Sequence, residues 1–120
     1  MRFAPETITV KAGDTVQWSN RDAFEPHTVT FAGSEQVPPY HFPEPQSQGP
    51  PKEYFNRKAA APVGGPSHDG TGFYGSGRLA QVIAPGTHTY SLTFTKPGTY
   101  TYWCVLHVPE GMRGTVVVVQ

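Results

Sequence analysis

Apolar and polar residues alternate along several short stretches of the chain, which is the pattern of β-strands with one buried face. The first two stretches, 7–10 and 15–20, flank a turn at 11–14, so the sequence predicts that they pair as a hairpin. The run 115–119 is almost all valine, which is typical of a buried central strand. The expected strands are 7–10, 15–20, 27–31, 81–83, 87–94, 99–103 and 115–119. Their number and spacing favour a β-sandwich.

Residues 33–75 do not follow this pattern. They are rich in Pro, Gly, Ser and Gln, as long loops are. They also contain the aromatic residues Tyr40, Phe42, Tyr54, Phe55, Phe73 and Tyr74. Disordered linkers are poor in aromatics, so we expect most of this segment to be ordered, wrapping the edge of the sandwich or covering one end. Residues 51–61 are compatible with one short helix. The segment has too little apolar mass for its own core, so we interpret it as an insertion within a single domain, residues 1–120.

Composition narrows the class of protein. The 120 residues fit one domain, and 9 basic residues balance 9 acidic ones, so nothing indicates binding to nucleic acid or to an anionic membrane surface. The 13 Gly and 13 Pro favour turns over a helical bundle. A single cysteine excludes an internal disulfide, a four-cysteine zinc site and a two-cysteine copper centre. The sequence has no apolar run long enough to span a membrane, and its first residues lack the pattern of a signal peptide.

The candidate chemistry lies on the loop between the last two expected strands. Cys104, His107 and Met112 occur close together there, and each is a soft or borderline metal ligand. A thiolate, two imidazoles and a weak axial thioether form the ligand set of an electron-transfer copper site. The second imidazole would come from His27, at the head of another expected strand. The sequence therefore predicts one copper ion bound by His27, Cys104, His107 and Met112.

Other interpretations of these residues stay open at this point. Structural zinc prefers several thiolates or imidazoles, so one Cys, two His and one Met make a poor zinc site. A cysteine nucleophile activated by histidine would need a third, orienting residue, and none stands out. Taken singly, the cysteine and the methionine could each be core residues. The remaining histidines have no partner at ligand spacing, and we expect them on the surface or in the insertion: His41, His68 and His88.

The copper loop and two earlier segments resemble the cupredoxins, the type 1 or blue copper proteins. The loop spacing is closest to the plastocyanin and pseudoazurin branch of that family, and the glycines and valines around it also match. The segments 3–20 and 26–29 resemble the opening of the family and its first-ligand segment. The motif that carries the resemblance is Cys104-x2-His107-x4-Met112.

The resemblance implies an all-β, Greek-key β-sandwich and a one-electron carrier that cycles copper between Cu(I) and Cu(II), not an enzyme. It implies a monomer whose protein redox partners dock on an apolar patch near His107, to which Phe24 and Pro26 would add. It also implies an extracytoplasmic location, in the periplasm or on the outer face of the cell membrane. We therefore expect an export signal or membrane tether upstream of this chain. A copper-delivery or storage protein, or a domain of a larger copper oxidoreductase, are the alternative functions.

Three positions differ from the usual pattern of the family. Thr28 stands where many members have an Asn that braces the copper loop, and Val105 stands where a hydroxyl residue is common. Trp103 replaces the usual Tyr or Phe before the cysteine, and packing is its expected role. The first two differences predict altered hydrogen bonds behind the copper ligands, and therefore an altered reduction potential.

Overall fold

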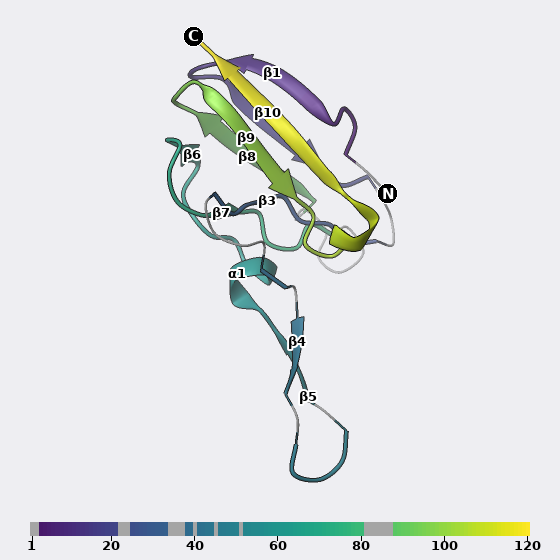
Figure 1. Ribbon diagram of the computed structural model, residues 1–120. Helices are drawn as coiled ribbons and strands as arrows, with labels where there is room; N and C mark the ends of the chain where they lie inside the picture. Colours follow the sequence, from purple (N-terminus) through teal and green to yellow (C-terminus); the bar gives the residue numbers. More distant parts are fainter. Residues whose placement is uncertain are drawn as a thin grey trace.

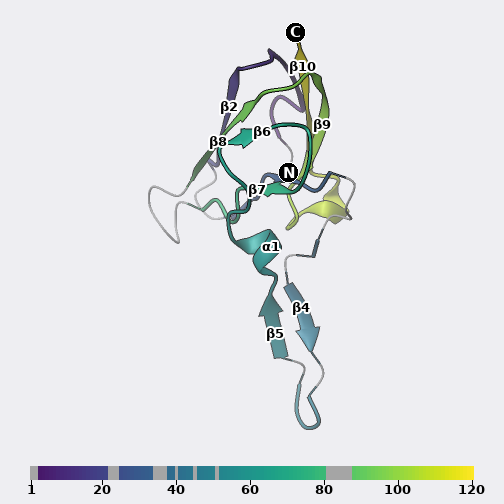
Figure 2. The same ribbon diagram turned by 90° about the vertical axis from the view of Figure 1, so that its left-hand side faces the viewer.

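The computed structural model describes residues 3–21, 25–33, 38–39, 41–44, 46–50, 52–80 and 88–120. Two β-sheets face each other across one hydrophobic core, and a two-stranded hairpin projects from this sandwich (Figure 1, Figure 2). The all-β sandwich that the sequence predicted is confirmed. None of the helices in the described ranges is long and apolar enough to cross a membrane.

The larger sheet has five strands in the order β1-β10-β9-β3-β7. Strand β10 pairs in parallel with β1 and antiparallel with β9. Val116 and Val118 on β10 are buried, so the valine-rich run is the central strand that the sequence predicted. The strands of this sheet are β1 (Thr7–Lys11), β10 (Arg113–Val119), β9 (Gly98–Trp103), β3 (Thr30–Phe31) and β7 (Tyr74–Gly75).

The smaller sheet has the order β2-β8-β6, with β2 (Thr15–Ser19), β8 (Thr89–Phe94) and β6 (Ser67–His68). The hairpin predicted for the first two strands is wrong, because β1 and β2 lie in different sheets. The turn between them contacts both sheets: the Ala12 N–H donates to the Val119 carbonyl and the Gly13 N–H donates to the Phe94 carbonyl, each at 2.7 Å. Alternation determines which face of a strand is buried, but it does not determine the neighbouring strand.

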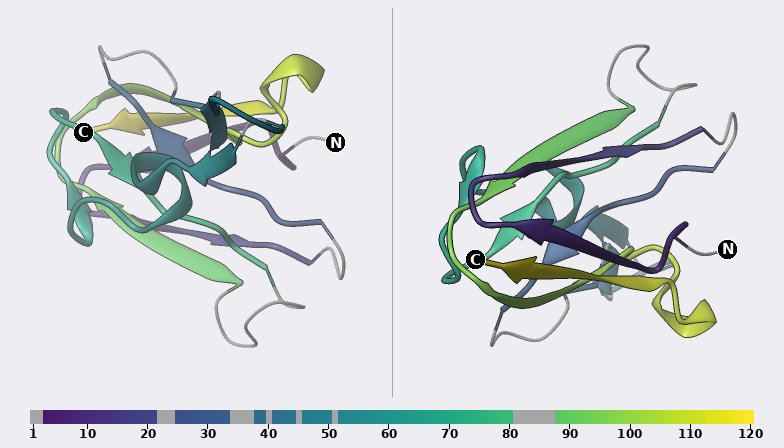
Figure 3. Two further views of the ribbon diagram at one scale, coloured as in Figure 1. Left: turned by 90° about the horizontal axis from the view of Figure 1, so that it is seen from below. Right: turned by 90° about the horizontal axis from the view of Figure 1, so that it is seen from above.

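Side chains from both sheets form one core, and Figure 3 shows the two layers that enclose it. Trp18 lies near its centre, with ring centroids 5.9 Å from Phe31 and 5.3 Å from Tyr102. These contacts are edge-on, as aromatic rings prefer. The buried residues of the core are Val16, Trp18, Val29, Phe31, Leu79, Leu92, Phe94, Tyr102, Val116 and Val118.

The segment 33–75 contributes to the sandwich and also extends beyond it. Strands β6 and β7 lie within it, and they pair with β8 and β3 respectively. Strands β4 (His41–Glu44) and β5 (Lys52–Phe55) pair only with each other, and they project away from the sandwich rather than wrapping its edge (Figure 1). The helix α1 (Arg57–Ala60) follows, so the short helix expected within 51–61 is present. The strand expected at 81–83 lies outside the described residues.

Candidate metal centre

His27 is held by a single β-bridge to Leu79. Its backbone N–H donates to the Leu79 carbonyl at 3.1 Å, and its carbonyl accepts the Leu79 N–H at 2.8 Å. The Asn20 side-chain amide donates to the carbonyls of Glu25 and Leu79 at 2.9 and 2.7 Å. Strand β3 begins only at Thr30, so the strand predicted around His27 is shorter than expected. This pairing fixes the backbone that carries the first predicted ligand.

A tight loop between β9 and β10 carries the other three predicted ligands. The Cys104 N–H donates to the Met112 carbonyl at 3.0 Å, and the Met112 N–H donates to the His107 carbonyl at 3.2 Å. The His107 N–H in turn donates to the Cys104 carbonyl at 3.1 Å. The 3-10 helix η1 (Val108–Glu110) fills the loop, and Gly111 ends it with a φ of 73°, a left-handed conformation that favours glycine. These bonds hold the three ligand-bearing residues at fixed separations.

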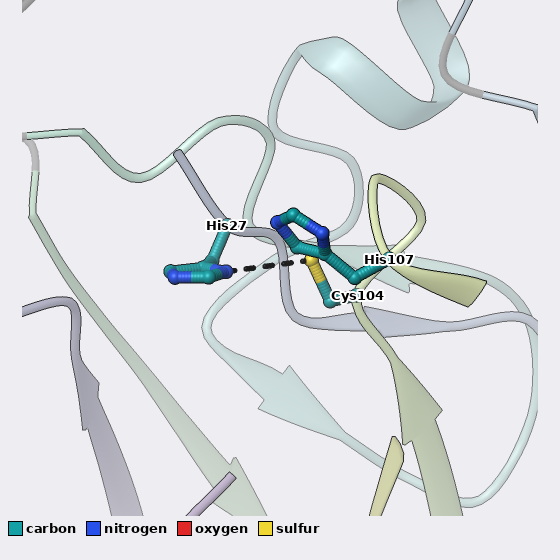
Figure 4. A group of neighbouring side chains, drawn as sticks. All are labelled: His27, Cys104 and His107. Atoms are coloured by element: carbon teal, nitrogen blue, oxygen red, sulfur yellow. Dashed lines mark hydrogen bonds between the residues drawn. The ribbon is translucent and has the colours of Figure 1, made fainter. Parts of the chain in front are cut away.

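The imidazoles of His27 and His107 converge on the thiol of Cys104 (Figure 4). One ligand atom from each residue lies within 4.8 Å of the other two. Cys104 Sγ is 3.8 Å from His27 Nδ1, and the two imidazole rings are 5.1 Å apart between centroids. In the described part of the chain, this is the one such group of His, Cys, Asp or Glu side chains. The fold thus brings together three of the four predicted ligands from two distant segments.

Met112, the fourth predicted ligand, has a buried side chain that is 4% exposed. It lines the same cavity as His27, a space of about 820 Å³ between β1 and β2 whose walls include Trp18 and Tyr102. Burial is typical of a core methionine as well as of an axial ligand. Its role as a ligand therefore stays a prediction.

Thr28 lies directly behind the cysteine and joins the two ligand-bearing segments. Its backbone N–H donates to Cys104 Sγ at 3.4 Å, and its hydroxyl accepts the Val105 N–H at 2.9 Å. The same hydroxyl is 3.0 Å from that of Thr30, and both threonines are fully buried. A threonine hydroxyl therefore braces the loop where the family pattern has an amide. Thr28 and Thr30 alternate with apolar residues in the stretch 27–31, which was predicted as a strand, and this alternation was the sequence signal for the network.

Trp103 packs as a strand residue. It pairs with Arg113 across β9 and β10. The guanidinium carbon of Arg113 lies 5.6 Å from the centre of the indole ring, within the range of a cation–π contact. The packing role predicted for Trp103 is therefore confirmed.

The site fits a soft or borderline metal ion. Burial raises the pKa of the Cys104 thiol above its ordinary value, and the hydrogen bond from Thr28 partly offsets this. A bound metal ion would favour the thiolate, because a coordinating thiol loses its proton. Nε2 of His107 is buried and has no hydrogen-bond partner among the described residues, which is costly unless another group binds it. One thiolate and two imidazoles suit copper better than a hard cation such as calcium.

Two carboxylates that the sequence analysis did not single out lie beside His107. Glu25 Oε2 is 4.0 Å from His107 Nε2, and Glu110 Oε2 is 3.9 Å from His107 Nδ1. Their side chains are 47% and 55% exposed, whereas that of His107 is 13% exposed. The i,i+3 spacing from His107 was a signal for Glu110. For Glu25, the sequence offered only its position two residues before His27.

The other histidines do not join this group. His68 lies in the insertion 33–75, one of the two places predicted for it, and it is buried there rather than exposed on the surface. Its strand β6 pairs with β8, and the ring stacks on Tyr74 and Phe94 with centroids 4.2 and 5.6 Å apart. His88 is partly buried just before β8, and the side chain of His41 lies outside the described part of the chain.

A β-sandwich with one buried thiol and two imidazoles converging at the end of a strand defines a cupredoxin-like copper protein. The profile of the copper-binding proteins of the plastocyanin/azurin family matches residues 1–119 of this chain. The chain belongs to that family, which confirms the resemblance found in its sequence.

Individual relatives are plastocyanins and amicyanin. The plastocyanin of Scenedesmus fuscus is 32% identical over 116 residues, covering 97% of this chain and 85% of the relative. The amicyanin of Paracoccus denitrificans is 30% identical over 118 residues and 98% of this chain, which spans 59% of the relative's length. Among solved structures, the Cu(I) form of an amicyanin variant is similar with a TM-score of 0.58 and 28% identity, covering 98% of this chain and 73% of that one.

Proposed function

We propose that this protein is a type 1 copper protein that carries single electrons between protein redox partners and does not convert a substrate. The observation that carries this proposal is the convergence of one buried thiol and two imidazoles within 4.8 Å in a member of a copper-binding family. When bound, copper supplies a centre that gains and loses one electron. Family membership favours this function over copper delivery or storage and over a domain of a larger oxidoreductase.

The chain's own residues keep the ligand set the same in both oxidation states. Cys104 is fully buried, so water is excluded from the sulfur. Its backbone is fixed by the end of β9 and by the hydrogen bond to Met112. The Thr28 N–H that donates to Sγ withdraws electron density from the sulfur and thereby tunes the reduction potential. Because the ligands are held by the fold, little rearrangement accompanies a change of charge.

Met112 is assigned as the weak fourth ligand. Its buried side chain and its place beside His27 in the same cavity support this role. Its backbone is hydrogen-bonded to both Cys104 and His107, so its position is coupled to theirs. A long thioether contact would affect the potential more than the affinity.

Electrons enter and leave through His107. Among the three predicted ligands on the loop, His107 is the partly exposed one, and Val108 and Pro109 beside it are exposed apolar residues on which a partner can dock. Glu25 and Glu110 add a polar rim to this surface. Phe24, which the sequence analysis placed in the same patch, lies outside the described residues.

The proposed location is outside the cytoplasm, in the periplasm or on the outer face of the cell membrane. Membership of the plastocyanin/azurin family supports it. We propose a monomer that meets its partners by diffusion or from a membrane tether encoded elsewhere in a longer chain.

A visible titration of the apo protein with Cu(II), followed by ascorbate, tests this function. We expect an intense thiolate-to-copper absorption that bleaches on reduction, returns on oxidation and is absent from the Cys104→Ser variant. Zinc serves as the control ion, because it binds the same donors without colour or redox change. A wild-type protein that binds copper without this absorption would contradict the electron-carrier function.

A further inference from the structure

The short helix α1 depends for its stability on packing against the rest of the protein. It spans Arg57–Ala60, and the Asn56 carbonyl accepts the N–H groups of Ala59 and Ala60 at 3.0 and 2.8 Å. A helix this short is not stable alone in water. It lies between the projecting hairpin and the sandwich (Figure 2). The helix is therefore stabilised by the neighbouring segments that it contacts.

One side of α1 packs on the copper loop. Ala59 is 1% exposed and forms a buried cluster with Val105, which is 7% exposed, while Ala60 and Leu106 complete that cluster. Val105 directly follows the ligand Cys104. Because the Val105 N–H is bonded to the Thr28 hydroxyl, a shift of Val105 would strain the hydrogen bonds behind the sulfur.

The end of α1 contacts the segment that holds His27. The Ala60 carbonyl accepts the Arg78 N–H at 3.2 Å. A Cβ added at Gly77 would lie 2.7 Å from the Ala61 carbonyl carbon, so the two backbones are in direct contact. Leu79, the residue after Arg78, makes both hydrogen bonds of the bridge to His27.

We infer that α1 is a positioning element for the metal centre, which sets the separation between the Cys104 loop and the His27 segment. The packing of Ala59 against Val105 positions the Cys104 loop. The hydrogen bond from Arg78 to Ala60 positions the segment that pairs with His27. An alanine suits this role because a larger side chain would push the loop outward and a glycine would leave a gap. Only the electrochemical readout of this inference rests on the proposed copper function.

The test compares Ala59→Leu with Ala32→Leu, a matched control at an alanine that is 5% exposed and follows β3. Both variants overpack a buried site, but Ala59 is the alanine that belongs to the buried cluster with Val105 on the copper loop. We expect Ala59→Leu to speed hydrogen exchange of the Val105 amide in the apo protein about tenfold relative to wild type. In the copper-loaded protein, we expect it to shift the reduction potential and the thiolate absorption. The control should change neither readout.

A second variant keeps the test decisive if Ala59→Leu does not fold. Ala59→Gly removes one methyl group and should loosen the Val105 amide in the same direction, even where the leucine variant does not fold. Unchanged exchange at Val105 in Ala59→Gly, or equal changes in the Ala32→Leu control, would overturn the role of α1. If wild type itself shows no thiolate absorption, the electron-carrier function fails, while the exchange measurement on the apo protein still decides the role of α1.

Discussion

The protein places imidazoles in two contrasting environments. In the candidate copper site, His27 and His107 face the thiol of Cys104, and Nε2 of His107 has no hydrogen-bond partner among the described residues. On β6, away from the copper loop (Figure 1), the imidazole of His68 is enclosed by aromatic rings, and its Nδ1 accepts the Gly70 N–H at 3.0 Å. A histidine is thus available to a metal where the ligand atoms of other residues converge on it. Where packing and a backbone N–H occupy the ring, it is a core residue.

The largest expected effect tests this contrast directly. His107→Ala removes a predicted ligand, so we expect copper affinity to fall by more than about 100-fold, the upper range for residues that only support a ligand. His68→Phe keeps the ring packing and should leave the affinity unchanged. Competition titrations with a chelator of known affinity measure both variants. The contrast would be refuted if His68→Phe weakened copper binding as much as His107→Ala.

The Thr28 hydroxyl is expected to stabilise the loop that carries Cys104 even when no metal is bound. Thr28→Val leaves the buried Val105 N–H without its acceptor, which should lower the free energy of unfolding by about 1–3 kcal/mol. Thr28→Ser keeps the hydroxyl and is the matched control. Urea unfolding of the apo proteins measures the difference. Equal stability of the Val and Ser variants would show that the hydroxyl does not brace the loop.

Stability should depend on pH through His68. Burial lowers the pKa of His68 below its ordinary value of 6.5, although nearby Asp69 opposes this shift. The unfolded chain therefore binds a proton more readily than the folded one. The free energy of unfolding should fall as the pH drops below 6.5 and level off once the folded pKa is passed. His68→Phe should flatten this part of the profile, measured on the apo protein from about pH 8 to about pH 4.5. A wild-type profile that coincides with that of His68→Phe would contradict the assignment.

The smallest expected effect concerns the Cys104 thiol. Since burial raises its pKa, the thiol of the apo protein should stay protonated at neutral pH and ionise only above the ordinary range. Binding of copper should then release a proton from the thiol. Ultraviolet absorbance of the thiolate during a pH titration measures the first effect, and the pH change in a weakly buffered copper titration measures the second. The Cys104→Ser variant is the blank for both, and a thiolate signal already present at neutral pH would contradict the prediction.

Much of the candidate site could be predicted from the sequence because its ligands are chemically distinctive. Only a few residue types bind copper, and Cys104, His107 and Met112 are close in the chain, so spacing alone linked them. The supporting residues are ordinary ones whose contacts arise only in three dimensions. Thr28 could have been an exposed strand residue, and nothing in the composition of the insertion marked Ala59 as the neighbour of Val105.

By itself, the sequence determined five of the strands (β1, β2, β8, β9 and β10), their buried faces, the sandwich class and the loop that carries the ligands, because these depend on residues close together in the chain. Only the tertiary structure decided that β1 and β2 belong to different sheets, that His68 is buried between rings, and that the hairpin stands outside the sandwich on α1. The physical reason is that alternation determines which side of a strand faces the core. The neighbour across the core or beside the strand depends on packing between segments that are far apart in the sequence.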